Sequence, residues 1–194
     1  KRGWKGSFYV TGKFARYTDR PEYANEDKVK ELIQTGHELG SHSSTHPFMS
    51  QLNTSDMIFQ SQNNFNYLKT LGQAPEGLAY PFGDFSEDVE TEVKRFFKYA
   101  RTSLIGLNDR SADPYRLRIL PITNSTTTLE LFNWIDDAER SSTWLILLFH
   151  DLSDIEDENP YNTGVIQYRQ VLDYLKTKEK IAVLPVNEAL KELK

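Results

Sequence analysis

The stretch GHELGSHSSTHPFM, residues 36–49, decides how the rest of the chain is interpreted, because it contains three of the four histidines. His42 and His46 are four residues apart, so a tight loop or one helical turn would bring their imidazoles to the same side. Two imidazoles placed in this way can bind one divalent metal. Pro47 disfavours a helical backbone at His46, so we expect the pair on a loop that follows a strand. The spacing alone also fits two solvated loop histidines.

The composition of the chain limits the classes of function that fit it. Lys and Arg number 23 against 28 Asp and Glu, and no basic stripe occurs, so nucleic acid is not an expected partner. No apolar run approaches the roughly 20 residues of a membrane-spanning helix. Without cysteine, a bound metal would have nitrogen and oxygen ligands. A length of 194 residues suits a single domain, residues 1–194, which we expect to be a monomer.

Hydrophobic periodicity predicts strands and helices that alternate along the chain. The expected strands are residues 4–10, 38–41, 77–80, 98–103, 117–122, 144–149 and 181–184. The expected helices are residues 26–35, 54–71, 86–97, 127–140, 168–175 and 187–193. The strand at 144–149 is apolar throughout and is expected to be buried on both faces. The alternation predicts an α/β fold with parallel strands, either a β/α barrel or a doubly wound open sheet.

Polar residues gather directly after three of the predicted strands. These segments are residues 41–49 with the histidine pair, YPFGDF at 80–85 and HDLSD at 150–154. In a β/α barrel the carboxyl ends of the strands meet on the face where functional sites are built. We therefore expect the three segments to lie on one face.

These segments resemble motifs of the polysaccharide deacetylase family, the NodB-homology domain of carbohydrate esterase family 4. GSFYVTG at 6–12 resembles the second strand of that family, and GHELGSHSSTH at 36–46 resembles its metal-binding H-S/T-x-x-H motif. LAYPFG at 78–83 resembles its groove-wall motif, and LLFHD at 147–151 the motif that carries the general acid. The likeness covers essentially the whole chain, and the histidine motif is its most specific part.

The resemblance implies a distorted (β/α)7-type barrel and a divalent metal, usually zinc. The implied reaction is hydrolysis of acetyl groups, mostly N-acetyl and less often O-acetyl, on an extracellular or cell-envelope polysaccharide such as an N-acetylglucosamine polymer. The implied site residues are His42 and His46 as metal ligands, His150 as the general acid, and Tyr80, Pro81 and Phe82 in substrate binding. The backbone N–H of Phe82 would help to hold the oxyanion.

Two departures from the family pattern affect this expectation. The Thr-Phe-Asp-Asp-Gly motif of the family supplies the general base and the third metal ligand, and the sequence contains no such motif. Its only adjacent aspartates, Asp136 and Asp137, fall within a predicted helix. Because the motif should precede residues 4–10, we expect the chain to be a shortened piece of a longer enzyme that lacks the first strand. In addition, the arginine that orients the base is replaced by Ala79, as in extracellular exopolysaccharide-type deacetylases.

Several alternatives stay open at this stage. Asp84, Asp113 and Asp151 could replace the missing carboxylates, although each suits a turn or cap better. His37 falls outside the ligand pair and is expected to have a structural, hydrogen-bonding role. Besides a deacetylase, the chain could be a non-catalytic NodB-like module that binds glycan, or a structural α/β domain whose histidines are incidental.

Overall fold

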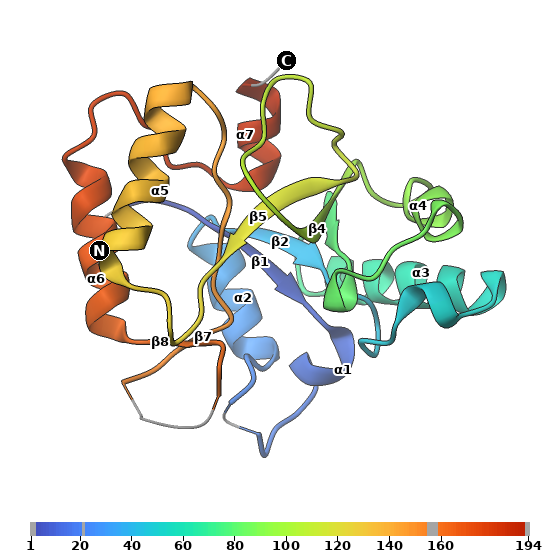
Figure 1. Cartoon of the computed structure of the whole chain (residues 1–194). Helices are drawn as coiled ribbons and strands as arrows, with labels where there is room; N and C mark the ends of the chain where they lie inside the picture. Colours follow the sequence, from blue (N-terminus) through green and yellow to red (C-terminus); the bar gives the residue numbers. More distant parts are fainter. Residues whose placement is uncertain (1–2, 21, 155–158, 193–194) are drawn as a thin grey trace. The chain divides into compact units, whose positions relative to one another are not determined.

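The computed structural model describes residues 3–20, 22–154 and 159–192 of the chain. Parallel strands alternate with helices through these ranges, which confirms the predicted α/β class (Figure 1). The described residues divide into two units. The first unit contains residues 3–20, 22–104, 113–117 and 183–192. The second unit contains residues 105–112, 118–154 and 159–182. The single domain over residues 1–194 stays a prediction.

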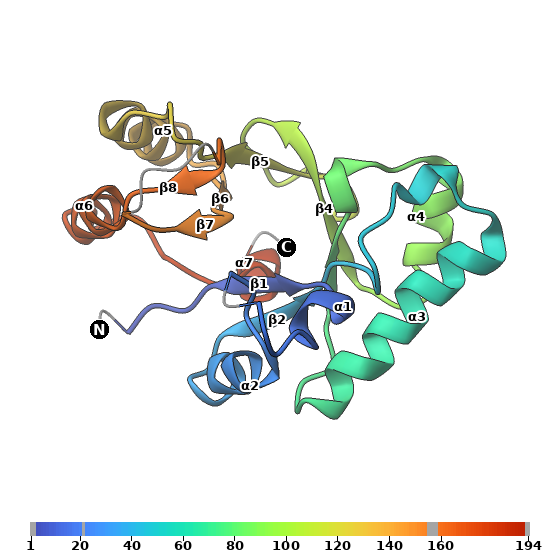
Figure 2. The ribbon, with the colours of Figure 1, turned by 90° about the horizontal axis from the view of Figure 1, so that it is seen from below.

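The first unit is built on four parallel strands in the order β1-β2-β3-β4. Their bounds are β1 Ser7–Val10, β2 Glu38–Ser41, β3 Gly77–Ala79 and β4 Tyr99–Ile105. The helices are α1 Gly12–Ala15, α2 Glu26–Gln34, α3 Thr54–Thr70, α4 Glu87–Val93 and α7 Val186–Glu192, with short 3-10 turns η1 Met49–Gln51 and η2 Pro81–Gly83. Figure 2 shows α2 beside β2, and α3 beside α4.

The strand register decides which side chains share a face of this sheet. Tyr9 lies opposite Gly40, and Ala79 lies opposite Arg101. Since side chains alternate along a strand, these four residues point to one face. The other face packs against the helices in two hydrophobic clusters. One is centred on Leu78 of β3, and the other on Leu39, which packs against Val29, Leu68 and Ala15.

Helix α3 has an unexpectedly polar buried face. Its buried residues are Met57, Gln60, Ser61, Asn64 and Leu68. Sequence periodicity predicts Ile58, Phe65 and Leu68 on the inner face, but Ile58 and Phe65 are only half-buried. The helix turns polar side chains inward because they bind the loop that follows β2, as described below.

The second unit contains two parallel strand pairs and two helices. Strand β5, Leu117–Pro121, pairs with β6, Leu147–Leu148, and β7, Asp151–Leu152, pairs with β8, Asn162–Thr163. Helices α5, Thr128–Ser141, and α6, Val165–Lys176, pack together around Ile122, Leu131, Ile135 and Val171. A capping box formed by Thr127 and Glu130 opens α5. Within the described ranges, no helix is both long and apolar enough to cross a membrane.

Three sequence predictions about elements are wrong. Residues 181–184 form no strand, since no ladder pairs with them and Pro185 has no N–H to donate. Residues 144–149 are paired as a strand only at Leu147–Leu148 and are half-buried, because β6 has β5 as its one strand neighbour in this unit. The helix predicted at 86–97 ends at Val93. The last residue of the helix predicted at 187–193 lies outside the described residues.

Candidate active site

The two histidines of interest lie on the loop that follows β2, as predicted. Strand β2 ends at Ser41, and the His42 N–H still donates to the Val10 carbonyl at 3.1 Å. Ser43 and His46 both have a φ of 63°, a left-handed conformation that is uncommon outside glycine. The His46 N–H donates to Ser43 Oγ at 2.9 Å and closes the turn. The loop therefore turns twice within four residues, which brings the imidazoles together.

The imidazoles face each other through their Nε2 atoms. These two nitrogens are 3.1 Å apart. His42 Nδ1 lies 2.8 Å from the Ala79 carbonyl oxygen, which can only accept a hydrogen bond, so neutral His42 carries its proton on Nδ1 and a lone pair on Nε2. Burial lowers the pKa of His46, which favours the neutral form of this ring. Both Nε2 lone pairs can therefore be directed at one cation.

The donor set fits part of a zinc site. Tetrahedral zinc with nitrogen ligands at about 2.0–2.1 Å would separate two of them by about 3.3 Å. The observed separation is 3.1 Å. Within the described residues, however, no group of three or more His, Cys, Asp or Glu could hold a metal. The described part of the chain thus supplies two ligands rather than the usual three.

The three aspartates considered as replacements for the missing carboxylates lie in different segments of the chain. Asp84 accepts hydrogen bonds from the N–H and the hydroxyl of Ser50, both at 2.7 Å. Asp113 accepts from the Tyr115 N–H at 2.8 Å, which is a turn interaction. Asp151 lies in β7 of the second unit. Asp113 therefore has the predicted turn role, whereas Asp84 binds Ser50, which lies 34 residues earlier in the chain.

Amide side chains of helix α3 hold the histidine loop in place through hydrogen bonds. Gln60 Oε1 accepts hydrogen bonds from the N–H groups of Ser44, at 3.0 Å, and Thr45, at 2.9 Å. Asn64 Nδ2 donates to Ser41 Oγ at 2.8 Å. Both amide side chains are buried, so these hydrogen bonds are screened little by water. This support offsets the strain of the two left-handed residues.

We expect Asn64→Ala to lower the free energy of unfolding by about 1–3 kcal/mol, because it leaves buried partners without their donor. The measurement is urea unfolding at 25 °C. Asn66→Ala is the matched control, since Asn66 lies exposed on the same helix. Equal unfolding free energies for the two variants would contradict the role given to Asn64.

Phe82 is the groove-wall residue that the structure brings to the histidine pair. The centroid of its ring lies 4.4 Å from that of His46. The same ring stacks on Phe48, with a centroid distance of 4.2 Å. Phe82 and Phe48 are 55% and 46% exposed. The Phe82 backbone has a φ of 57°, and no described residue accepts a hydrogen bond from its N–H. This N–H is thus available to a ligand, as an oxyanion contact requires.

The other two groove-wall residues are placed differently. Tyr80 is fully buried, its ring stacks on Phe85 at 5.4 Å, and burial raises the pKa of its hydroxyl. Pro81 is also buried, at the start of η2. Substrate binding by Tyr80 and Pro81 stays a prediction.

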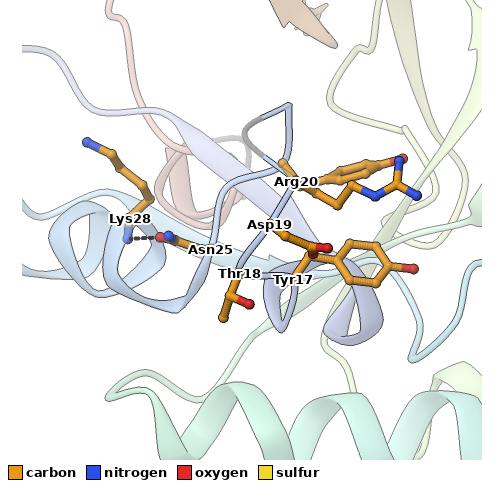
Figure 3. A pocket seen from close by; sticks show the side chains of 7 residues that line it. Tyr17, Thr18, Asp19, Arg20, Asn25 and Lys28 are labelled. Atoms are coloured by element: carbon orange, nitrogen blue, oxygen red, sulfur yellow. Dashed lines mark hydrogen bonds between the residues drawn. The ribbon is translucent and has the colours of Figure 1, made fainter.

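Aromatic side chains continue beyond His46 to a surface pocket. The Phe14 ring lies 6.0 Å from His46 and stacks on Tyr23 at 4.7 Å. The pocket has a volume of about 400 Å³, and Figure 3 shows side chains of the segment between α1 and α2 around it. It is lined by Tyr17, Thr18, Asp19, Arg20, Tyr23, Asn25 and Lys28. The dashed line in Figure 3 is the 3.1 Å hydrogen bond from the Lys28 N–H to Asn25, which begins α2.

The remaining histidines are His37 and His150. His37 Nδ1 accepts a hydrogen bond from the Gly6 N–H at 3.0 Å, and its ring packs edge-on to Phe8, so its predicted structural role is confirmed. His150 belongs to the second unit, where its exposed ring lies 4.7 Å from Tyr161. Its role as general acid stays a prediction.

The facing imidazoles lie just beyond the carboxyl end of a parallel strand, which is where β/α barrels build their functional sites. Solved structures with a similar fold include the chitin deacetylase of Colletotrichum lindemuthianum, with 16% identity and a TM-score of 0.67 over 97% of this chain and 76% of that one. The Xyl-CE4 domain of a multidomain xylanase from the hindgut metagenome of Trinervitermes trinervoides has 18% identity and a TM-score of 0.66 over 98% and 78% of the two chains. These similarities confirm the predicted fold class, that of carbohydrate esterase family 4.

The sequence comparison agrees with the fold. Residues 1–98 match the profile of the polysaccharide deacetylase family. The chain belongs to this family, as its motifs indicate. It is 33% identical over 86 residues to the uncharacterized protein YlxY of Bacillus subtilis (strain 168), a match that covers 44% of this chain. The matched part is 25% of the length of YlxY.

Proposed function

We propose that this protein hydrolyses acetyl groups on a polysaccharide with the help of a divalent metal, and that the metal is zinc. The observation that carries the proposal is the 3.1 Å approach of His42 Nε2 to His46 Nε2, with His42 Nδ1 held by the Ala79 carbonyl. Family membership supports the reaction class. The motif resemblance favours N-acetyl over O-acetyl groups, an N-acetylglucosamine polymer as substrate, and an extracellular or cell-envelope location.

The residues of the first unit can perform separate parts of this reaction. When bound, the metal supplies Lewis acidity that polarises the acetyl carbonyl and activates water. His42 and His46 would hold it through Nε2, and the Ala79 carbonyl fixes the tautomer and the orientation of the His42 ring. The Phe82 N–H, with no acceptor among the described residues, would donate to the oxygen of the acetyl group as negative charge develops on it.

Exposed aromatic rings beside the histidines suit a sugar substrate. Phe48 and Phe82 stack with an interplanar angle of 14° and present an apolar face directly next to His46. The C–H faces of a pyranose ring can pack on such a surface while its hydroxyls stay in water. Tyr23 adds a further partly exposed ring on the Phe14 side of His46.

A second candidate function is a non-catalytic glycan-binding module. It is favoured by the finding that the described residues include no set of three or more His, Cys, Asp or Glu able to hold a metal. The exposed aromatic surface would serve such a module equally well.

The test is calorimetric titration of the 194-residue chain with zinc, combined with acetate release from an acetylated glucosamine oligomer. We expect a dissociation constant on the order of 1 µM or weaker and slow acetate release, because two imidazoles leave the site short of three protein ligands. Tight zinc binding with rapid release would show that the two-ligand description is wrong. Oligomer binding without acetate release at saturating zinc would instead support the glycan-binding module.

A further inference from the structure

Arg101 is a buried cation on the same sheet face as the histidine pair. It lies on β4 opposite Ala79, and the Ala79 carbonyl is the group that holds His42. Adjacent strands are about 4.8 Å apart, so the Arg101 backbone is one strand spacing from that carbonyl. The positive charge of Arg101 also lowers the pKa of His46, a smaller effect than that of burial. Arg101 therefore lies on the strand next to the one that holds His42.

The guanidinium of Arg101 has no anionic partner among the described residues. The residue is 7% exposed, its buried Nε has no hydrogen-bond partner, and no described carboxylate forms an ion pair with it. The guanidinium lies over the Tyr9 ring, whose centroid is 5.3 Å from Arg101 Cζ. Burying a charge without a partner is costly, so a buried cation of this kind would gain by binding an anion.

Small residues make room for this arrangement. Ala79, opposite Arg101 on β3, has only a methyl side chain, and Gly40 lies under the Tyr9 ring, where a Cβ would overlap the ring. Since Arg101 and Tyr9 point to the same face as these small residues, the guanidinium lies over the middle of the sheet. A planar fork of N–H donors in this position matches a carboxylate.

We propose that Arg101 is the carboxylate-binding residue of this site, supplied from β4 because β3 carries Ala79 at the neighbouring position. It positions a carboxylate beside His42 and His46. This inference rests on the proposed deacetylase function, in which acetate is released at the histidine pair. The carboxylate has two potential sources: acetate itself, or a carboxylate side chain in a polypeptide longer than these 194 residues.

The first arm of the test is a titration of the metal-free chain with sodium acetate at constant ionic strength, followed by Tm. We expect a saturable rise in Tm for the wild type, binding at least about 10-fold weaker in Arg101→Met, and an intermediate value in Arg101→Lys. Arg95→Met is the control, since Arg95 is exposed and paired with Glu92. Without acetate, Arg101→Met should melt no lower than the wild type, whereas a purely structural role would lower its Tm.

The second arm separates the two sources with a chain extended at its N-terminus by the expected Asp-Asp motif. If a side chain is the source, Arg101→Met lowers the Tm of the extended chain, and the extension weakens acetate binding by the wild type. The proposal is wrong if Arg101→Met changes neither acetate affinity nor the Tm of the extended chain. Because neither arm uses zinc or turnover, this failure is distinct from a failure of the deacetylase proposal.

Discussion

Replacing both His42 and His46 with alanine is expected to abolish zinc binding and to lower acetate release at least about 100-fold in any form of the protein with measurable activity. The physical reason is that a Lewis-acidic metal contributes several kcal/mol to the barrier, and each 1.36 kcal/mol changes the rate tenfold. The two Nε2 atoms, 3.1 Å apart, are the facing imidazole donors on the loop after β2. Metal content by mass spectrometry and acetate release are the two measurements.

His37→Ala is the matched control for this double variant. His37 lies five residues before His42, but its Nδ1 accepts from the Gly6 N–H and its ring packs on Phe8. We expect His37→Ala to keep the zinc stoichiometry and to lose only about 1 kcal/mol of stability. If the double variant retained as much zinc as the wild type, the histidines would be incidental and the deacetylase site would be excluded.

The sequence predicts the histidine loop well because its determinants are local. Four-residue spacing and Pro47 after His46 already require a turn outside a helix, and β2 has the bounds that periodicity predicts. Helix starts are also local, because Asn53 and Ser86 each accept a hydrogen bond from a backbone N–H in the first turn of their own helix. Such features need only a few neighbouring residues to form.

The support beneath the loop could not be predicted in the same way. Periodicity analysis considers only apolar residues, so it places the polar Gln60 and Asn64 on the solvent-exposed face of α3. In the structure both lie on the buried side of the helix, with Met57 and Leu68. Their partners lie 15 to 54 residues earlier in the chain, from Thr45 for Gln60 to Val10 for Asn64. One signal was present: two amides at i and i+4 on the stripe that also carries apolar residues.

Arg101 was missed for a related reason. The sequence shows that the arginine expected at position 79 is absent, but only the register of β3 with β4 shows an arginine directly opposite. The strand predicted at 181–184 fails for the same physical reason. Apolar content is a property of the segment, whereas a ladder depends on a partner elsewhere in the chain.

Gly77→Ala is expected to cause the largest loss of stability, about 3 kcal/mol of unfolding free energy or more, because it overpacks a rigid site. A Cβ on Gly77 would overlap the Tyr99 ring. That ring is 1% exposed, and its hydroxyl is hydrogen-bonded to Glu38 and Tyr9, so it cannot move aside without breaking buried polar contacts. Urea unfolding of the variant measures the loss.

A double-mutant cycle with Tyr99→Leu tests whether steric overlap is the cause. Tyr99→Leu alone should also destabilise, since it removes a donor to the buried Glu38 carboxylate. If the overlap is the cause, Gly77→Ala should cost less in the Tyr99→Leu background, with a coupling of about 0.5–3 kcal/mol. Additive losses would show that the backbone of β3, rather than the ring above it, requires glycine. Gly6→Ala is the control, because the nearest atom to its added Cβ is 3.8 Å away.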